Sequence, residues 1–221
     1  MRKYRFTALL LSMLLMASIL APAAQAAPAP NIMAEAALLM DAANDEVLYE
    51  KNARERMYPA SLTKVMTALL VLEEVDAGRL SLDQVVTASN TFSTGLTANG
   101  STQDIRAGEQ MSVRDLLYCL LVASANESAN ILAETVDGSI SAFVERMNLR
   151  ATELGCEGTH FANPHGLHVD DHYTTAHDIY LIARTAMENE TFPPSCPPAV
   201  MRSPPPTCTR PACFTAPTPC W

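Results

Sequence analysis

The amino-acid sequence predicts one domain of mixed α/β structure, of the α+β type, in which a cluster of helices lies beside an antiparallel sheet. Two short apolar-rich runs near the N-terminus surround a turn-favouring segment, a pattern typical of a β-hairpin. Five later segments have the apolar patterning of helices. The length of 221 residues suits a single globular domain.

The first 26 residues are predicted to be a secretory signal peptide. Basic residues at positions 2, 3 and 5 precede an apolar run over 6–21, and a small-residue triplet ends at Ala26. A membrane anchor is the alternative, but two serines interrupt the run and Pro22 ends it, short of the roughly 20 apolar residues that a spanning helix needs. We therefore expect cleavage after Ala26, export to the periplasm or the outer face of the cell membrane, and no transmembrane segment in the mature chain.

The hairpin is predicted over residues 36–40 and 46–49, with the turn at Asp41–Asp45. The next segment, Pro59–Lys64, leads into residues 65–72, which are apolar on nearly every face. A helix with that pattern is buried on all sides.

The remaining helices are predicted from caps and periodicity. Ser112 with Asp115 resembles a capping box and opens a helix over residues 113–122. The triplet Ser124–Asn126 then breaks the apolar run before helical patterning resumes through 131–133, so a polar corner joins two buried helices. Residues 141–154 predict a helix that a glycine ends, and Thr175 with Asp178 opens another through residue 186. Residues 91–100 are predicted to be a loop.

The segment 193–221 differs from everything before it. It has ten prolines and four cysteines, but no Gly, Leu, Ile, Lys, Asp or Glu, so neither a helix nor a strand is expected. Only Cys119 and Cys156 lie in the well-patterned part. A shifted reading frame followed by a chance stop would produce such a disordered tail, and a genuine proline-rich tail is the alternative.

Ser61 and Lys64 are the first candidates for chemistry. They are three residues apart at the start of a helix, so their side chains lie on one face. A serine hydroxyl needs a base to become a nucleophile, and a lysine desolvated by an apolar helix can serve. The structural alternative is that Ser61 only caps the helix and Lys64 reaches solvent.

Ser124 and Asn126 add a second hydroxyl and an amide, suited to relaying a proton and holding a substrate amide. The order Ser-x-x-Lys then Ser-x-Asn matches the first two of three motifs of penicillin-recognising serine enzymes. Residues 32–192, including the runs 59–68 and 161–167, resemble the low-molecular-weight D-alanyl-D-alanine carboxypeptidases, of the β-lactamase/transpeptidase-like fold. Residues 27–192 would be the N-terminal part of that penicillin-binding catalytic domain.

The resemblance implies a role for each candidate. Ser61 would be the nucleophile, Lys64 its general base, Ser124 the proton relay and Asn126 a substrate-binding residue. The implied substrates are peptidoglycan stem peptides ending in D-Ala-D-Ala, with β-lactam antibiotics as inhibitors and no cofactor. A net charge of −9 leaves no basic face for nucleic acid. The five histidines between 160 and 177 suggest a metal site, but the family binds no metal there, so none is expected.

The third motif, Lys-Thr-Gly, is absent from these residues, because lysine occurs only at positions 3, 51 and 64. In the family that strand binds the substrate carboxylate and supplies an oxyanion donor, so the activity of this chain is in doubt and the C-terminal strands of the sheet are expected to be missing. We expect the product to be unstable or partly open around Ser61, since an isolated hairpin is marginal in water. A serine β-lactamase and a non-catalytic fragment are the alternative functions.

Overall fold

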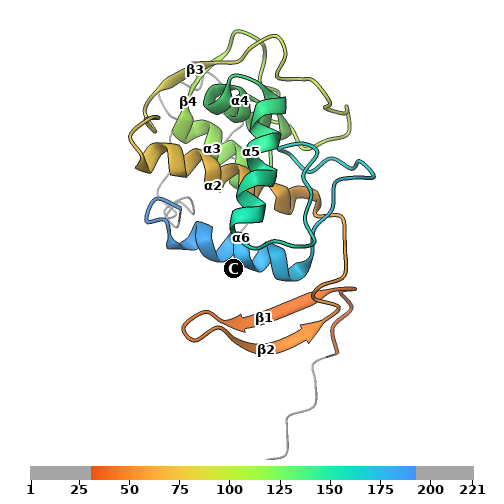
Figure 1. Ribbon diagram of the computed structural model, residues 1–221. Coiled ribbons are helices and arrows are strands. Elements are labelled where there is room, and N and C mark those ends of the chain that lie inside the picture. The colour runs from red at the N-terminus through yellow and green to blue at the C-terminus, as the bar shows by residue number, and fades with distance from the viewer. Residues whose placement is uncertain (1–30, 193–221) are drawn as a thin grey trace, which may run out of the picture. The chain divides into compact units, whose positions relative to one another are not determined.

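The computed structural model describes residues 31–192, so the expected signal peptide over 1–26 and the expected tail over 193–221 lie outside the described residues. Within them, two small antiparallel sheets accompany five α-helices (Figure 1). The elements in chain order are β1 (Ala37–Asp41), β2 (Glu46–Lys51), the 3₁₀ turn η1 (Ala60–Leu62), α2 (Thr63–Asp76), β3 (Val85–Thr87), β4 (Gln110–Ser112), α3 (Val113–Leu121), α4 (Asn126–Asp137), α5 (Ile140–Glu153) and α6 (Ala176–Glu188).

The predicted N-terminal hairpin is confirmed. Strands β1 and β2 pair antiparallel, with a bulge between Leu39 and Met40. The turn between them contains Asp45 in the left-handed region, at φ 57°. Asp45 accepts a hydrogen bond of 2.9 Å from the Tyr180 hydroxyl and forms an ion pair with Arg184, both on α6. The tip of the hairpin is therefore held against α6.

Helix α2 is buried on nearly every face, as predicted from its apolar pattern. One side of α2 packs with α3, α4 and the β3–β4 pair in a first core cluster, which includes Ala68, Val71 and Leu72. The other side packs with α5 and α6 in a second cluster, which includes Met66 and Leu69. Because α2 belongs to both clusters, its N-terminal turn has a position fixed by the whole helical body.

The predicted helix boundaries rest on observed caps. The Ser112 hydroxyl accepts the Asp115 N–H at 3.1 Å at the start of α3, and Thr175 accepts the Asp178 N–H at 3.0 Å at the start of α6. Gly155 follows the end of α5 with φ 80°, a left-handed conformation that glycine adopts without strain. The short pair β3–β4 was not predicted, because three-residue strands leave no clear alternation.

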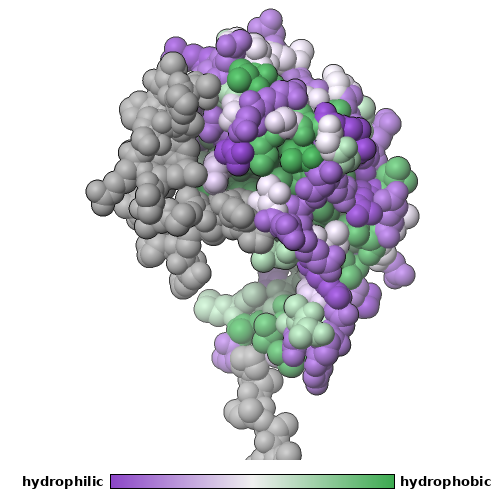
Figure 2. All heavy atoms as spheres, turned by 90° about the vertical axis from the view of Figure 1, so that its left-hand side faces the viewer, coloured by the Kyte–Doolittle hydropathy of each residue, from purple (hydrophilic) through white to green (hydrophobic). Residues whose placement is uncertain are grey.

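The hairpin leaves several apolar side chains in solvent, and Figure 2 shows hydrophobic residues gathered on it. Leu39, Val47 and Leu48 are 56%, 49% and 56% exposed. This exposure agrees with a sheet that lacks further strands within the described residues. No helix within residues 31–192 combines the length and the apolar composition that a membrane crossing requires.

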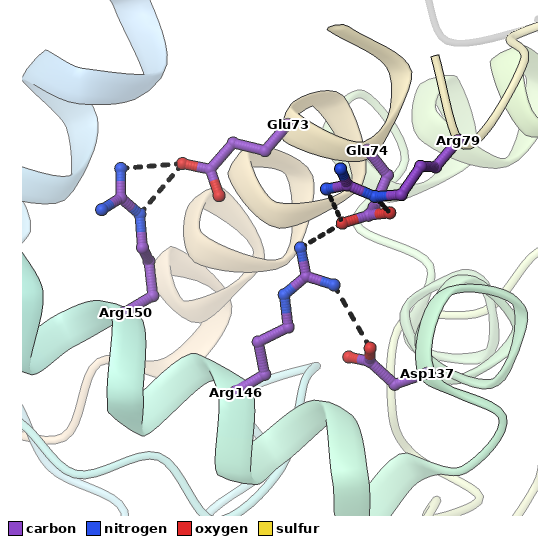
Figure 3. Close-up of polar contacts among 6 residues, drawn as sticks. All are labelled: Glu73, Glu74, Arg79, Asp137, Arg146 and Arg150. Atoms are coloured by element: carbon purple, nitrogen blue, oxygen red, sulfur yellow. Dashed lines mark hydrogen bonds and ion pairs between the residues drawn. The ribbon is translucent and has the colours of Figure 1, made fainter. Parts of the chain in front are cut away.

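A network of charged side chains joins α2, α4 and α5 on the side shown in Figure 3. Glu74 on α2 accepts hydrogen bonds from Arg79 at 2.6 and 2.8 Å and also pairs with Arg146 of α5. Arg146 in turn contacts Asp137 at 3.2 Å at the end of α4. The hydrogen bonds from Arg79, together with Arg146, hold the pKa of Glu74 at about 2, although burial of the carboxylate opposes this shift. Glu74 is therefore ionised throughout the neutral range.

Replacing Glu74 by Gln should destabilise the fold by about 2 kcal/mol at pH 7, because two arginines lose their carboxylate in a largely buried place. The control is Glu73→Gln on the same helix, which removes the partner of Arg150 at a more exposed place, where the Glu73 side chain is 28% exposed, and should cost less than about 1 kcal/mol. Urea unfolding measures both. Since the folded pKa of Glu74 lies below its usual 4.5, its contribution is full above that pH and is lost as the pH falls toward 2. Equal losses in the two variants at pH 7 would contradict the assignment.

Candidate active site

Ser61 lies in the 3₁₀ turn η1, immediately before α2, and is exposed to solvent. The prediction placed it at the start of the helix itself, whereas α2 begins at Thr63. Ala60, the preceding residue, has φ 47°, a left-handed conformation that costs an L-residue roughly 1–2 kcal/mol. This strained residue turns the chain from Pro59 into the helix and presents the Ser61 hydroxyl outward.

The alternative that Ser61 only caps the helix is wrong. The cap position of α2 is Leu62, and no side chain caps the helix there. The Ser61 hydroxyl instead accepts hydrogen bonds from Lys64 Nζ at 3.3 Å and from Ser124 Oγ at 3.0 Å. Three of the four candidate residues thus meet in one hydrogen-bonded cluster, although Ser124 is 63 residues away in the chain.

Lys64 does not reach solvent, which also contradicts the structural alternative. The residue is only 2% exposed, and its amine donates to the backbone carbonyl of His165 at 2.7 Å as well as to Ser61. Burial lowers the pKa of Lys64 to about 8, and the negative charge of Glu127 acts in the opposite direction. A lysine with that pKa has a substantial neutral fraction near neutral pH and can accept a proton.

Ser124 is positioned by the polar corner predicted between two helices. It lies in the break between α3 and α4, and its φ of 56° is in the left-handed region. Ala60, the residue before Ser61, has a left-handed conformation as well. The chain then enters α4 at Asn126. One strained residue, Ala60, precedes Ser61 in the chain, and the other, Ser124, donates to its hydroxyl. Backbone strain of this kind is typical of functional sites.

Asn126 lies beside this cluster rather than in it. Its side chain is buried against the loop before β4, since a Cβ atom on Gly100 would come within 2.6 Å of the Asn126 amide nitrogen. Its backbone N–H donates to the Ser101 carbonyl at 3.0 Å. Asn126 and this loop line a cavity of about 530 Å³. The substrate-binding role of Asn126 stays a prediction, as do the catalytic roles of Ser61, Lys64 and Ser124.

The segment between α5 and α6 holds Lys64 in place, and the candidates chosen from the sequence did not include it. Its carbonyls at Pro164 and His165 accept from Thr67 Oγ1 at 2.6 Å and from the Lys64 amine. Gly166 approaches the η1 turn so closely that a Cβ atom would lie 1.8 Å from the Ala60 carbonyl oxygen, and its φ is 89°. The run Asn163–Gly166 was the available signal, because such a turn sequence favours a tight backbone approach.

Two of the five histidines are buried in this segment as neutral side chains. His172 Nδ1 accepts the Ala162 N–H at 2.9 Å, so the neutral ring carries its proton on Nε2 and donates to Thr63 Oγ1 at 2.8 Å. Burial lowers the pKa of both His165 and His172 to about 4. Within residues 31–192, no three side chains of the metal-ligating types lie close enough together to hold a metal ion.

Comparison with known families and structures gives a consistent result. Residues 23–193 match the model of the Peptidase S11 family, described as D-alanyl-D-alanine carboxypeptidase. The chain is 38% identical over 160 residues to D-alanyl-D-alanine carboxypeptidase DacF of Bacillus subtilis, which covers 72% of this chain and 40% of DacF. The chain therefore spans less than half the length of this curated relative.

Two solved structures share the fold. The D-alanyl-D-alanine carboxypeptidase DacD from Francisella tularensis superposes with a TM-score of 0.70 and 39% identity, covering 81% of this chain and 43% of that one. Penicillin binding protein 5 from Haemophilus influenzae gives a TM-score of 0.71 and 31% identity, covering 75% of this chain and 48% of that one. These similarities confirm the predicted fold class.

Gly166→Ala should lower the free energy of unfolding by about 2 to 3 kcal/mol, because the new methyl group must displace the Ala60 carbonyl. The matched control is Gly155→Ala, where φ is also positive but no atom lies within 4 Å of the new Cβ. That control should cost about 1 kcal/mol, the strain of the left-handed conformation alone. Thermal unfolding of both variants measures the difference, and an equal cost would mean that the close approach to η1 does not exist.

Proposed function

Because this chain belongs to the D-alanyl-D-alanine carboxypeptidase family, we propose that Ser61 is the nucleophile of a serine-type carboxypeptidase acting on peptidoglycan stem peptides that end in D-Ala-D-Ala. The observation that carries the proposal is the cluster of Lys64, Ser61 and Ser124, in which a buried amine and a second hydroxyl both contact one exposed hydroxyl. That is the arrangement an acyl-transfer nucleophile needs.

The reaction begins with removal of the Ser61 proton. Neutral Lys64 takes that proton as Ser61 Oγ attacks the carbonyl carbon of the penultimate D-alanine. The tetrahedral intermediate collapses when the C–N bond breaks, and the proton passes from Lys64 through the Ser124 hydroxyl to the leaving amine of D-alanine. Water then hydrolyses the acyl-Ser61 ester and restores the hydroxyl. The backbone N–H of Ser61 supplies one half of the oxyanion hole.

Substrate binding falls to groups around the cluster. Asn126 lines the cavity beside Ser124, and its amide is suited to hold a substrate amide. A Lys-Thr-Gly strand, which binds the substrate carboxylate in such enzymes and supplies the second oxyanion donor, does not occur in these 221 residues. Loss of one oxyanion donor typically costs about 100- to 1,000-fold in rate, so turnover by these residues alone should be slow or absent.

The alternative functions are a serine β-lactamase and a non-catalytic fragment. The serine β-lactamase alternative has less support, because Ala125 stands where those enzymes typically carry Asp, and the matched family is a carboxypeptidase family. The proposed location is outside the cytoplasm, where peptidoglycan is found and where the predicted signal peptide over 1–26 would direct the chain.

Incubation with a fluorescent penicillin should label the protein covalently, and Ser61→Ala should abolish the label. The control is Ser141→Ala, an exposed serine on α5 whose replacement should leave labelling unchanged. Mass spectrometry over time distinguishes the alternatives, because a β-lactamase loses the adduct rapidly, a carboxypeptidase keeps it, and a non-catalytic fragment is not labelled at Ser61. Labelling that persists in Ser61→Ala would overturn the assignment of the nucleophile.

A further inference from the structure

Glu127, the second residue of α4, has surroundings that the proposed reaction does not explain. It follows Asn126 directly and is only 2% exposed. One carboxylate oxygen, Oε1, accepts from Thr102 Oγ1 at 2.7 Å and from the Gln103 N–H at 2.5 Å. The other oxygen, Oε2, is buried and has no hydrogen-bond partner within residues 31–192.

A buried carboxylate with one unpartnered oxygen is costly unless a positive charge compensates it. Two features of its surroundings are complementary to negative charge: the pair of donors at Oε1, and its place in the first turn of α4, at the positive end of the helix dipole. Arg106 lines the same cavity as Glu127, but its side chain is exposed and forms no ion pair with Glu127.

Lys64 is a buried cation that lacks, within residues 31–192, a negatively charged partner in direct contact. It is the second residue of α2, so the N-terminal end of that helix disfavours its positive charge. Its amine contacts only neutral oxygens, those of Ser61 and of the His165 carbonyl, and forms no ion pair within the described residues. The Ser61 hydroxyl contacts both the Lys64 amine, at 3.3 Å, and the Ser124 hydroxyl, at 3.0 Å. Ser124 stands three residues before Glu127, so the N-terminal ends of α2 and α4 meet at Ser61 and bring a buried cation and a buried anion into the same region.

We propose that the Glu127 carboxylate is the counter-charge of the Lys64 ammonium, and that Glu127 is a positioning residue that acts on the reaction only through Lys64. The inference deepens the proposed function, because it concerns the residue assigned there as the base. The titratable groups that interact with Lys64 are Glu127 from α4 and the neutral His165 from the segment before α6, with the neutral His172 next to His165. Among them Glu127 is the only anion.

The electrostatics agree with this geometry. Burial lowers the pKa of Lys64, and the negative charge of Glu127 raises it. The pKa of about 8 is the result of both effects, so burial without Glu127 would give a lower pKa. A neutral residue at position 127 should therefore lower the pKa of Lys64. Glu127 would in this way set the pH above which Lys64 can act as a base.

The chain offers a direct measurement, because it contains only three lysines, Lys3, Lys51 and Lys64. The full chain labelled with ¹³C,¹⁵N-lysine is titrated by NMR, and the Lys64 signal is assigned by its loss in Lys64→Met. In Glu127→Gln the pKa of Lys64 should fall by about one unit, the lower end of the effect of a nearby opposite charge. The Lys51 signal serves as the internal reference, because this half-buried lysine of the hairpin binds the Ala34 carbonyl at 2.7 Å and has no contact with Glu127.

Two control variants separate charge from structure. Glu134→Gln removes another carboxylate of α4, one that binds Ser89 and Thr91 at 2.6 Å and so holds a loop in the same way. Thr102→Ala removes a donor to Glu127 and keeps the charge. Both should leave the pKa of Lys64 unchanged. Glu127→Met is a second neutral variant with an apolar side chain of similar length, and either neutral variant that folds provides the test.

The outcomes are distinct. A lower pKa of Lys64 in the neutral variants alone supports the proposal. An unchanged pKa of Lys64 in the neutral variants overturns the proposal, and so does an equal change in Glu134→Gln and Thr102→Ala. Glu127 would then only hold the loop at Thr102 and Gln103 in place. The titration requires no turnover, so a failure of penicillin labelling would refute the proposed function and leave this result standing.

Discussion

The buried amine of Lys64 determines how the rest of the site must be built. Removing an ammonium group from water is costly, and here the atoms in direct contact with the amine are two neutral oxygens. The same burial lowers its pKa to about 8, which is the property that a base needs. Every element that contacts Lys64 therefore contributes both to stability and to the proposed chemistry.

Three backbone features follow from this constraint. Helix α2 is buried on nearly every face because it lies between two core clusters, and Lys64 is buried with it. The His165 carbonyl reaches the amine only because Gly166 can approach the turn before Ser61 without a side chain. Ala60 and Ser124 take left-handed conformations on either side of the Ser61 hydroxyl, and the packed helices maintain that strain.

Much of this arrangement could be predicted from local patterns in the sequence. The spacing of Ser61 and Lys64, the caps at Ser112 and Thr175 and the polar break at Ser124 are short-range signals, and each lies where it was expected. The capping role considered for Ser61 was wrong, because the strained Ala60 shifts Ser61 into a 3₁₀ turn outside the helix.

The parts that could not be predicted depend on contacts between distant segments. The acceptor for Lys64 is a backbone carbonyl, so the identity of His165 carries no signal for it. The proposed role of Glu127 depends on how α2 and α4 pack, which their separate periodicities do not specify. The strands β3 and β4 are three residues each, too short for a recognisable alternation. The Pro/Cys-rich tail over 193–221 lies outside the described residues.

The central claim is that burial turns Lys64 into the base that activates Ser61. The most direct test is the rate at which a penicillin acylates Ser61 as a function of pH, followed by stopped-flow fluorescence or quenched mass spectrometry. The account predicts a rate that rises with pH with a midpoint near 8, the pKa of Lys64. A rate that is constant between about pH 6 and 9, or one that rises near pH 6.5 as for an ordinary histidine, would contradict it.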